Sequence, residues 1–224
     1  WRRFIDQMLL WCGVIALGAA LIFFLAYNWQ TMGRFAKFGL AEAAIVCALI
    51  ACWKLGLEST AGKASLLLAS LFTGALLALV GQTYQTGADT YELFLVWAIA
   101  ITAWVLLAQL GAMVLFWLGL VNLSVLLYFQ TFGGFFGLLF SSSNQLWAML
   151  ILNAVALLVW EWLRWRGVHY LQARWSVRVV ATLVGVLATT LMLEAILSDG
   201  DRYRQIGQSA NLLAILTYLV WAPL

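Results

Sequence analysis

The polar sequence GQTYQTGADTYE (Gly81–Glu92) interrupts a long apolar region and indicates how this chain folds. The apolar run ASLLLASLFTGALLALVG (Ala64–Gly81) precedes it, and the run LFLVWAIAITAWVLLAQL (Leu93–Leu110) follows it. Each run approaches the roughly 20 apolar residues that an α-helix needs to cross the hydrocarbon core of a bilayer. The polar sequence is therefore expected where the chain leaves the bilayer between two membrane-spanning helices.

The composition extends this interpretation to the whole chain. Of its 224 residues, 65% are hydrophobic and only 9% are charged, whereas about a quarter of the residues in soluble domains are charged. Hydrocarbon cannot satisfy free backbone amides, and the alternating pattern of a membrane β-barrel is not visible. We predict an all-α polytopic bundle forming a single transmembrane domain over 1–224. It has seven complete spans and a truncated eighth, at 9–27, 38–57, 64–81, 93–110, 112–130, 146–163, 176–197 and 212–224.

The basic residues predict the orientation, because cytoplasmic loops of membrane proteins carry an excess of Lys and Arg. Eight of the twelve basic residues fall on the side of the N-terminus. This side is predicted to be cytoplasmic, so that Gly81–Glu92 faces outward. Because the chain begins at Trp1 and ends inside an apolar stretch, we expect it to be part of a longer protein. The eight basic residues on the side of the N-terminus are Arg2, Arg3, Lys54, Lys63, Arg164, Arg166, Arg174 and Arg178.

Small residues recur every four positions in the third span, at Ser70, Gly74 and Ala78. Such a stripe lets two helix backbones approach closely, which is how helices associate in lipid. The same spacing continues to Gln82, so this amide is predicted to point toward protein rather than lipid.

Two carboxylates, Glu42 and Glu194, lie about one turn inside predicted spans, on the same side as Asp89 and Glu92. Each can extend outward to the aqueous interface, which is the simpler interpretation. Alternatively, both turn inward beside Asp89 and Glu92 and form an acidic pocket. Asp89 and Glu92 also match the capping box at the start of a helix, in which each side chain bonds a free backbone amide. Capping does not exclude ligand binding.

Glycines mark two segments as candidate interruptions of helical structure. Gly81 and Gly87 are expected to supply the backbone turns of the outward-facing loop. The glycine-containing segment 131–145 is too short to cross the membrane, so we expect it to lie at the surface or to form a re-entrant segment. Asn122 and Asn153, in the middle of spans, are expected to be hydrogen-bond partners between helices.

The sequence offers little support for several classes of function. All three cysteines lie in apolar spans without a CxxC pair, and His169 is the only histidine, so we predict neither a metal nor a cofactor. No HExxH, GxSxG or phosphate-binding loop is present, and we expect no enzymatic activity, although carboxylates alone could serve as acid and base. No run of Lys and Arg suggests nucleic acid.

Three segments together resemble a known family of bacterial membrane proteins, the domain-of-unknown-function family 2157. They are AYNW (Ala26–Trp29), RFAKF (Arg34–Phe38) and GQTYQTGADTYELF (Gly81–Phe94). The resemblance implies a polytopic inner-membrane protein, with a short soluble region before the first span and further spans after the eighth, but it implies no activity. It also implies motif positions at Tyr27, Asn28, Trp29, Gln82, Tyr84, Gln85, Gly87, Ala88 and Asp89.

Two functions follow as hypotheses. In the first, the protein binds or transports a small polar or cationic solute at the outward-facing polar cluster. There, amides and carboxylates take the place of the water around the solute, and aromatic rings stack on the solute. In the second, it is a structural or sensory membrane subunit that acts through a protein partner, with Ser70, Gly74 and Ala78 as the contact face. The candidate ligand-binding residues are Asn28, Trp29, Glu42, Gln82, Tyr84, Gln85, Asp89, Glu92 and Glu194.

Overall fold

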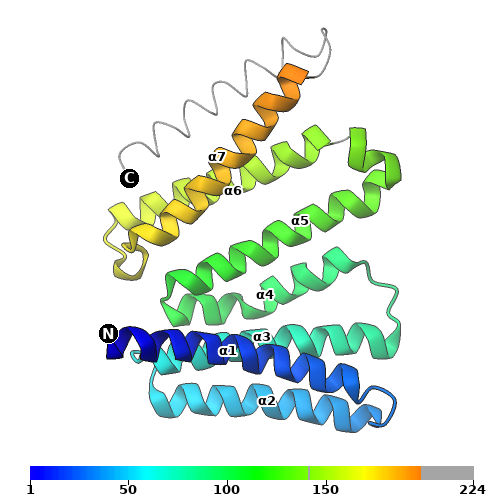
Figure 1. Cartoon of the computed structure of the whole chain (residues 1–224), viewed down its shortest axis with the longest axis vertical. Helices are drawn as coiled ribbons and strands as arrows, with labels where there is room; N and C mark the ends of the chain where they lie inside the picture. Colours follow the sequence, from blue (N-terminus) through cyan, green and yellow to red (C-terminus); the bar gives the residue numbers. More distant parts are fainter. Residues whose placement is uncertain (141, 198–224) are drawn as a thin grey trace. The chain divides into compact units, whose positions relative to one another are not determined.

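The computed structural model describes residues 1–140 and 142–197. Within these residues all regular structure is helical, in agreement with the all-α prediction (Figure 1). The helices are α1 (Arg2–Tyr27), α2 (Arg34–Leu55), α3 (Thr60–Tyr84), α4 (Thr90–Ala108), α5 (Gly111–Phe140), α6 (Ser142–Trp165), the short 3₁₀ helix η1 (His169–Leu171) and α7 (Arg174–Leu197).

The seven α-helices of the described chain are all long and apolar enough to cross a membrane. Their outer surfaces expose large apolar side chains: Phe23 is 72% exposed and Trp53 is 83% exposed. Water would oppose such exposure, whereas lipid tails are as apolar as the side chains themselves. The seven predicted complete spans are thereby confirmed in a multi-pass membrane protein. The eighth, at 212–224, lies outside the described residues.

Several boundaries differ from the prediction. The helices α2 and α4 each end two residues before the predicted span, at Leu55 and Ala108. The predicted interruption around Gly133 and Gly137 is wrong, because α5 continues as a helix to Phe140. Glycine weakens a helix by about 1 kcal/mol but does not forbid it, and lipid favours the conformation that satisfies every backbone amide internally.

The chain divides into two compact units, Trp1–Met113 and a second that begins at Val114. Each unit packs around its own apolar side chains. The prediction that residues 1–224 form a single transmembrane domain therefore stays a prediction.

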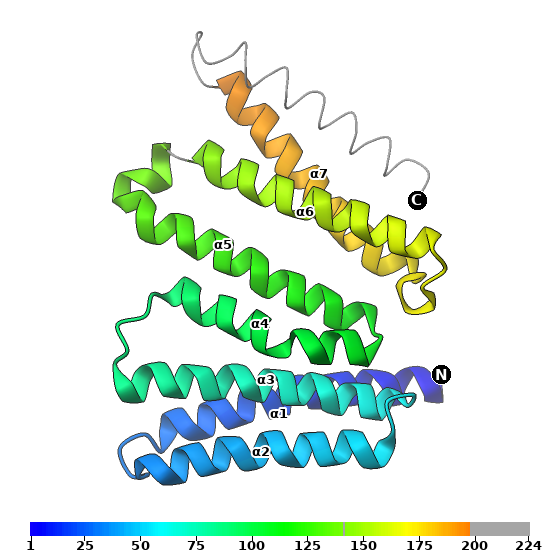
Figure 2. The ribbon, with the colours of Figure 1, turned by 180° about the vertical axis from the view of Figure 1, so that it is seen from behind.

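Helix α3 is the centre of the first unit, where it packs against α1, α2 and α4 (Figures 1 and 2). Small residues on α3 make this possible, because a helix with short side chains can be approached on several faces. The core formed by α1, α2 and α3 contains Leu21, Leu25, Ala48, Ala69, Phe72 and Ala75.

In the second unit, α6 and α7 pack together, and Val177, Val180 and Val184 of α7 are fully buried. An amide pair joins α5 to α6. The Asn122 Nδ2 donates to Asn153 Oδ1 at 3.1 Å, and the Asn153 Nδ2 donates to Asn122 Oδ1 at 2.5 Å. Each amide also donates to a carbonyl of its own helix. This confirms the prediction that the two asparagines bond between helices.

Candidate functional site

The loop between α3 and α4 is shorter than the sequence suggests. The helix α3 runs through Gly81 to Tyr84, so Gly81 does not supply a turn and that prediction is wrong. Gln85 ends the helix in the left-handed conformation, with φ 45° and ψ 51°. Gly87 has φ 68°, a region where a side chain is strained, and it provides the expected turn.

Asp89 occupies the N-cap position of α4, as predicted, but the reciprocal side-chain bonds of a capping box are not formed. Its backbone is extended, with φ −68° and ψ 154°, and its carboxylate accepts no bond from the first turn. The Oε1 atom of Glu92 accepts instead from the hydroxyl of Tyr91 at 3.3 Å. Both carboxylates therefore keep acceptor capacity that a capping box would have used.

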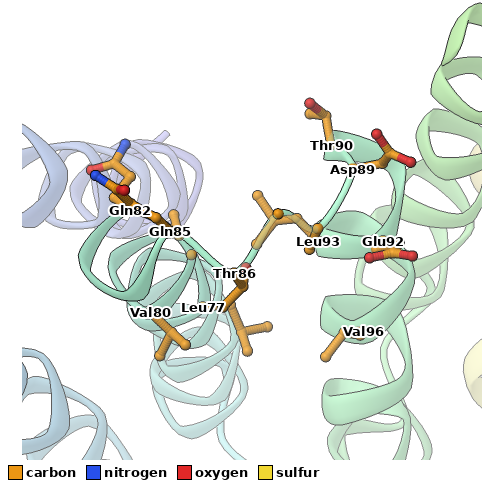
Figure 3. Close-up of a pocket in the computed structure, with 14 residues that line it drawn as sticks. Leu77, Val80, Gln82, Gln85, Thr86, Asp89, Thr90, Glu92, Leu93 and Val96 are labelled. Atoms are coloured by element: carbon orange, nitrogen blue, oxygen red, sulfur yellow. The ribbon is translucent and has the colours of Figure 1, made fainter.

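A pocket of about 390 Å³, here called the polar pocket, lies between the end of α3 and the start of α4. Figure 3 shows the amides of Gln82 and Gln85 on its α3 side and the carboxylates of Asp89 and Glu92 on its α4 side. Its wall thus changes from polar at the loop to apolar within the span. The remaining lining residues are Leu77, Ala78, Val80, Gly81, Thr86, Gly87, Ala88, Thr90, Leu93 and Val96.

The charge around the polar pocket is negative. Within the part of the chain that the structure describes, no Lys or Arg lines it, and neither Asp89 nor Glu92 forms a salt bridge. The C-terminal end of α3 carries a partial negative charge and the N-terminal end of α4 a partial positive charge, each about half an elementary charge, so the two helix ends offset each other. The negative charge of the polar pocket therefore comes from the side chains of Asp89 and Glu92.

A second, smaller cavity of about 260 Å³, here called the apolar cavity, lies among α1, α3 and α4. It shares Ala78, Gln82 and Leu93 with the polar pocket, so the two spaces adjoin along the last turns of α3. Gln82 is its only lining residue with an amide or charged side chain. The residues that line the apolar cavity but not the polar pocket are Ile22, Leu25, Ala26, Trp29, Gly74, Ala75, Leu79, Phe94 and Trp97.

Trp29 lines the apolar cavity, and its ring also contacts a lysine side chain. The ammonium nitrogen of Lys37 lies 3.7 Å from the centroid of the indole ring, and the lysine side chain is buried. A cation over the face of an indole is attracted by the negative face of the ring. Trp29 is thereby fixed in position between the start of α2 and the cavity. Sequence reasoning missed this role of Lys37.

The structure brings only part of the predicted ligand site together. Gln82, Gln85, Asp89 and Glu92 share the polar pocket, and Trp29 joins Gln82 at the apolar cavity. The other four candidates line neither space. The Nδ2 of Asn28 donates to the Phe24 carbonyl, Tyr84 packs on the Phe38 ring, Glu42 is exposed on α2, and Glu194 belongs to α7 in the second unit.

Two residues of the small-residue stripe, Ser70 and Gly74, pack against α4 of the same chain, whereas Ala78 lines both spaces. The indole nitrogen of Trp97 donates to the Ser70 carbonyl at 2.8 Å, and the Trp97 ring lies against Gly74. A contact face for another protein at Gly74 is therefore ruled out by the ring that covers it. Gln82 lines both cavities, but its side chain is exposed rather than turned into the protein.

Among the residues that the structure describes, no group of three or more His, Cys, Asp or Glu side chains could hold a metal ion.

The seven apolar helices of the described residues define the class of this molecule as an all-helical, multi-pass integral membrane protein. The chain belongs to the family described as predicted membrane protein (DUF2157), whose model matches residues 2–114. The matched range contains every residue of the polar pocket and the apolar cavity. No curated protein and no solved structure matches the chain.

Proposed function

We propose that this integral membrane protein binds a small cationic solute in the polar pocket, without catalysing a reaction. The observation that carries the proposal is the lining of the pocket of about 390 Å³: among the described residues it includes two amides and two carboxylates but no basic residue. Asp89 and Glu92 lie three positions apart, so their charges repel, and a bound cation relieves that repulsion.

The apolar part of the lining favours an organic cation over a hydrated metal ion. Leu77, Val80 and Val96 offer no ligand to a metal, whereas they pack well against the carbon atoms of an amine. The amides of Gln82 and Gln85 can accept hydrogen bonds from an ammonium group through their oxygen atoms. A substituted amine or quaternary ammonium is therefore the favoured chemical class.

Binding can be measured with tetramethylammonium as the probe, using the protein in lipid nanodiscs and isothermal titration. We expect the double variant Asp89→Asn, Glu92→Gln to bind at least about tenfold more weakly, because two charge-assisted interactions are lost. Glu58→Gln is the matched control, since this exposed acid lies in the α2–α3 loop and should leave affinity unchanged. Equal affinity in the double variant and the wild type would refute the proposal.

We further propose that the N-terminus is cytoplasmic and that the polar pocket faces the exterior of a bacterial inner membrane, on the basis of the distribution of Lys and Arg. Cysteine labelling tests this in cells, after Cys12, Cys47 and Cys52 have been replaced. An impermeant maleimide should label Thr86→Cys in intact cells, and it should label Glu58→Cys only after permeabilisation. The reverse pattern would invert the orientation.

The alternative of a structural or sensory subunit loses its main support. Trp97 of α4 contacts Ser70 and covers Gly74, two of the three small residues that suggested a protein partner. Of the two hypotheses, only solute binding is therefore supported by a specific feature of the structure, the polar pocket.

A further inference from the structure

We infer that the cation bound in the polar pocket carries an apolar tail, which lies in the apolar cavity among α1, α3 and α4. This inference rests on the proposed function, since it names the class of ligand for the same site. It begins from the shared residues: Ala78, Gln82 and Leu93 line both spaces. The two spaces adjoin at these three residues, so the tail of a molecule bound in the polar pocket would pass their side chains to enter the apolar cavity.

The two spaces differ sharply in chemistry. The polar pocket has Asp89 and Glu92 on its wall, whereas the apolar cavity has only Gln82 among amide or charged side chains. A ligand that fits both has a positive end and a hydrocarbon end. An amphiphilic amine has this distribution of charge. A phospholipid fits less well, because its phosphate would lie beside two carboxylates with no basic residue in the lining of either space.

The direction of the apolar cavity suits such a tail. Along α3 the lining extends from Gln82 to Gly74, which is about 12 Å at the rise of an α-helix. It thus leads from the polar loop toward the interior of the span, as the tail of an amphiphile does in a bilayer. Trp29, held by Lys37, and the rings of Phe94 and Trp97 supply flat apolar walls.

The end of the cavity that is distant from the loop is bordered by the contact between Trp97 and Gly74. The Trp97 ring covers Gly74 and donates to the Ser70 carbonyl, so it is not free to swing into the space. Ala26 lies on the α1 side and lines the apolar cavity but not the polar pocket. A large side chain at position 26 would fill the tail site and leave the acids untouched.

The experiment compares tetramethylammonium with octyltrimethylammonium by titration into nanodiscs, with partition into empty nanodiscs subtracted. We expect the octyl compound to bind at least about tenfold more tightly, because its methylenes move into an apolar site. In Ala26→Trp the octyl compound should lose this gain, whereas tetramethylammonium should bind as it does to the wild type. Phe23→Trp is the control, since this exposed side chain of α1 lines neither space. Octyl sulfate, the anionic analogue, should not bind.

The possible results separate the two proposals. If tetramethylammonium binds through the acids but the octyl gain is equal in wild type and Ala26→Trp, the tail site is refuted and the solute site survives. If the affinity for both compounds is unchanged in the double variant Asp89→Asn, Glu92→Gln, the solute site itself is refuted.

A second measurement covers the case in which Ala26→Trp does not fold. An octylamine with a photoreactive group at the end of its chain should label peptides that contain residues 22–29 and 93–97 of the wild type. Excess octyltrimethylammonium should prevent this labelling. Even labelling of all lipid-facing helices would overturn the inference.

Discussion

Replacing Gly74 by alanine tests the contact that holds α3 against α4. A Cβ atom at this position would lie closer than 3.0 Å to three atoms of the Trp97 six-membered ring. The backbone of α3 cannot yield easily, so the ring has to move. Its movement would break the bond from the indole nitrogen to the Ser70 carbonyl, which measures 2.8 Å.

The magnitude follows from two terms. Forcing an extra methyl group into a packed contact costs about 1–3 kcal/mol, and a lost hydrogen bond costs about 0.5–1.5 kcal/mol. Alanine also gains up to about 1 kcal/mol of helix propensity over glycine. Gly39→Ala measures that gain alone, because nothing lies within 4 Å of a Cβ at Gly39. We expect Gly74→Ala to be about 2–4 kcal/mol less stable than Gly39→Ala.

The assay is unfolding of the purified protein by increasing SDS in mixed micelles, followed by circular dichroism. A double-mutant cycle adds Trp97→Leu, which should cost much less in the Gly74→Ala background than in the wild type, because the same contact is already lost. Equal stability of Gly74→Ala and Gly39→Ala, or additive effects in the cycle, would show that the Trp97 ring does not hold the two helices together.

Three further predictions use the same unfolding assay. Asn153→Leu should destabilise the second unit by about 1–2 kcal/mol, and the double variant with Asn122→Leu should recover part of this loss, because neither amide is then left alone; additive losses would contradict it. Ser59→Ala should cost about 1 kcal/mol, since the hydroxyl caps α3 by accepting from a first-turn amide at 2.9 Å. Lys37→Met should cost about 0.5–1 kcal/mol while Lys37→Arg keeps the contact with Trp29; equal losses in both would count against a cation–π contact.

The spans and the packing face could be read from the sequence, because both depend on local composition. An apolar run near the thickness of a bilayer predicts a helix wherever it occurs. The four-residue spacing of Ser70, Gly74 and Ala78 predicts a close helix contact, and Trp97 provides it. The sequence did not identify Trp97 as that partner, since the pairing depends on how α4 is rotated about its axis.

Glu42 shows how rotation about a helix axis decides which residues meet. On α2 the buried residues include Ala41, Ala48 and Cys52, so the acid at position 42 lies off the packed face and is exposed. The small residues of this face could have indicated, from the sequence alone, which side of α2 is packed. The apolar cavity left no comparable signal, because an unfilled space results from how three helices pack and not from the sequence of any one of them.

The loop after α3 was only partly predictable, for a different reason. Glycine permits a turn but does not require one, and Gly81 remained helical while Gln85 adopted the left-handed conformation. The Asp-x-x-Glu pattern located the first residue of α4 correctly. It could not predict the side-chain bonds, which depend on the path of the loop.

The unit boundary at Met113 has a consequence for the membrane topology of the chain. The family model ends at residue 114, one position beyond that boundary, and the unit before it contains four helices able to cross a membrane. An even number of crossings returns the chain to the leaflet from which it started. If all four helices cross, the residues that follow Met113 begin on the same side of the membrane as the N-terminus.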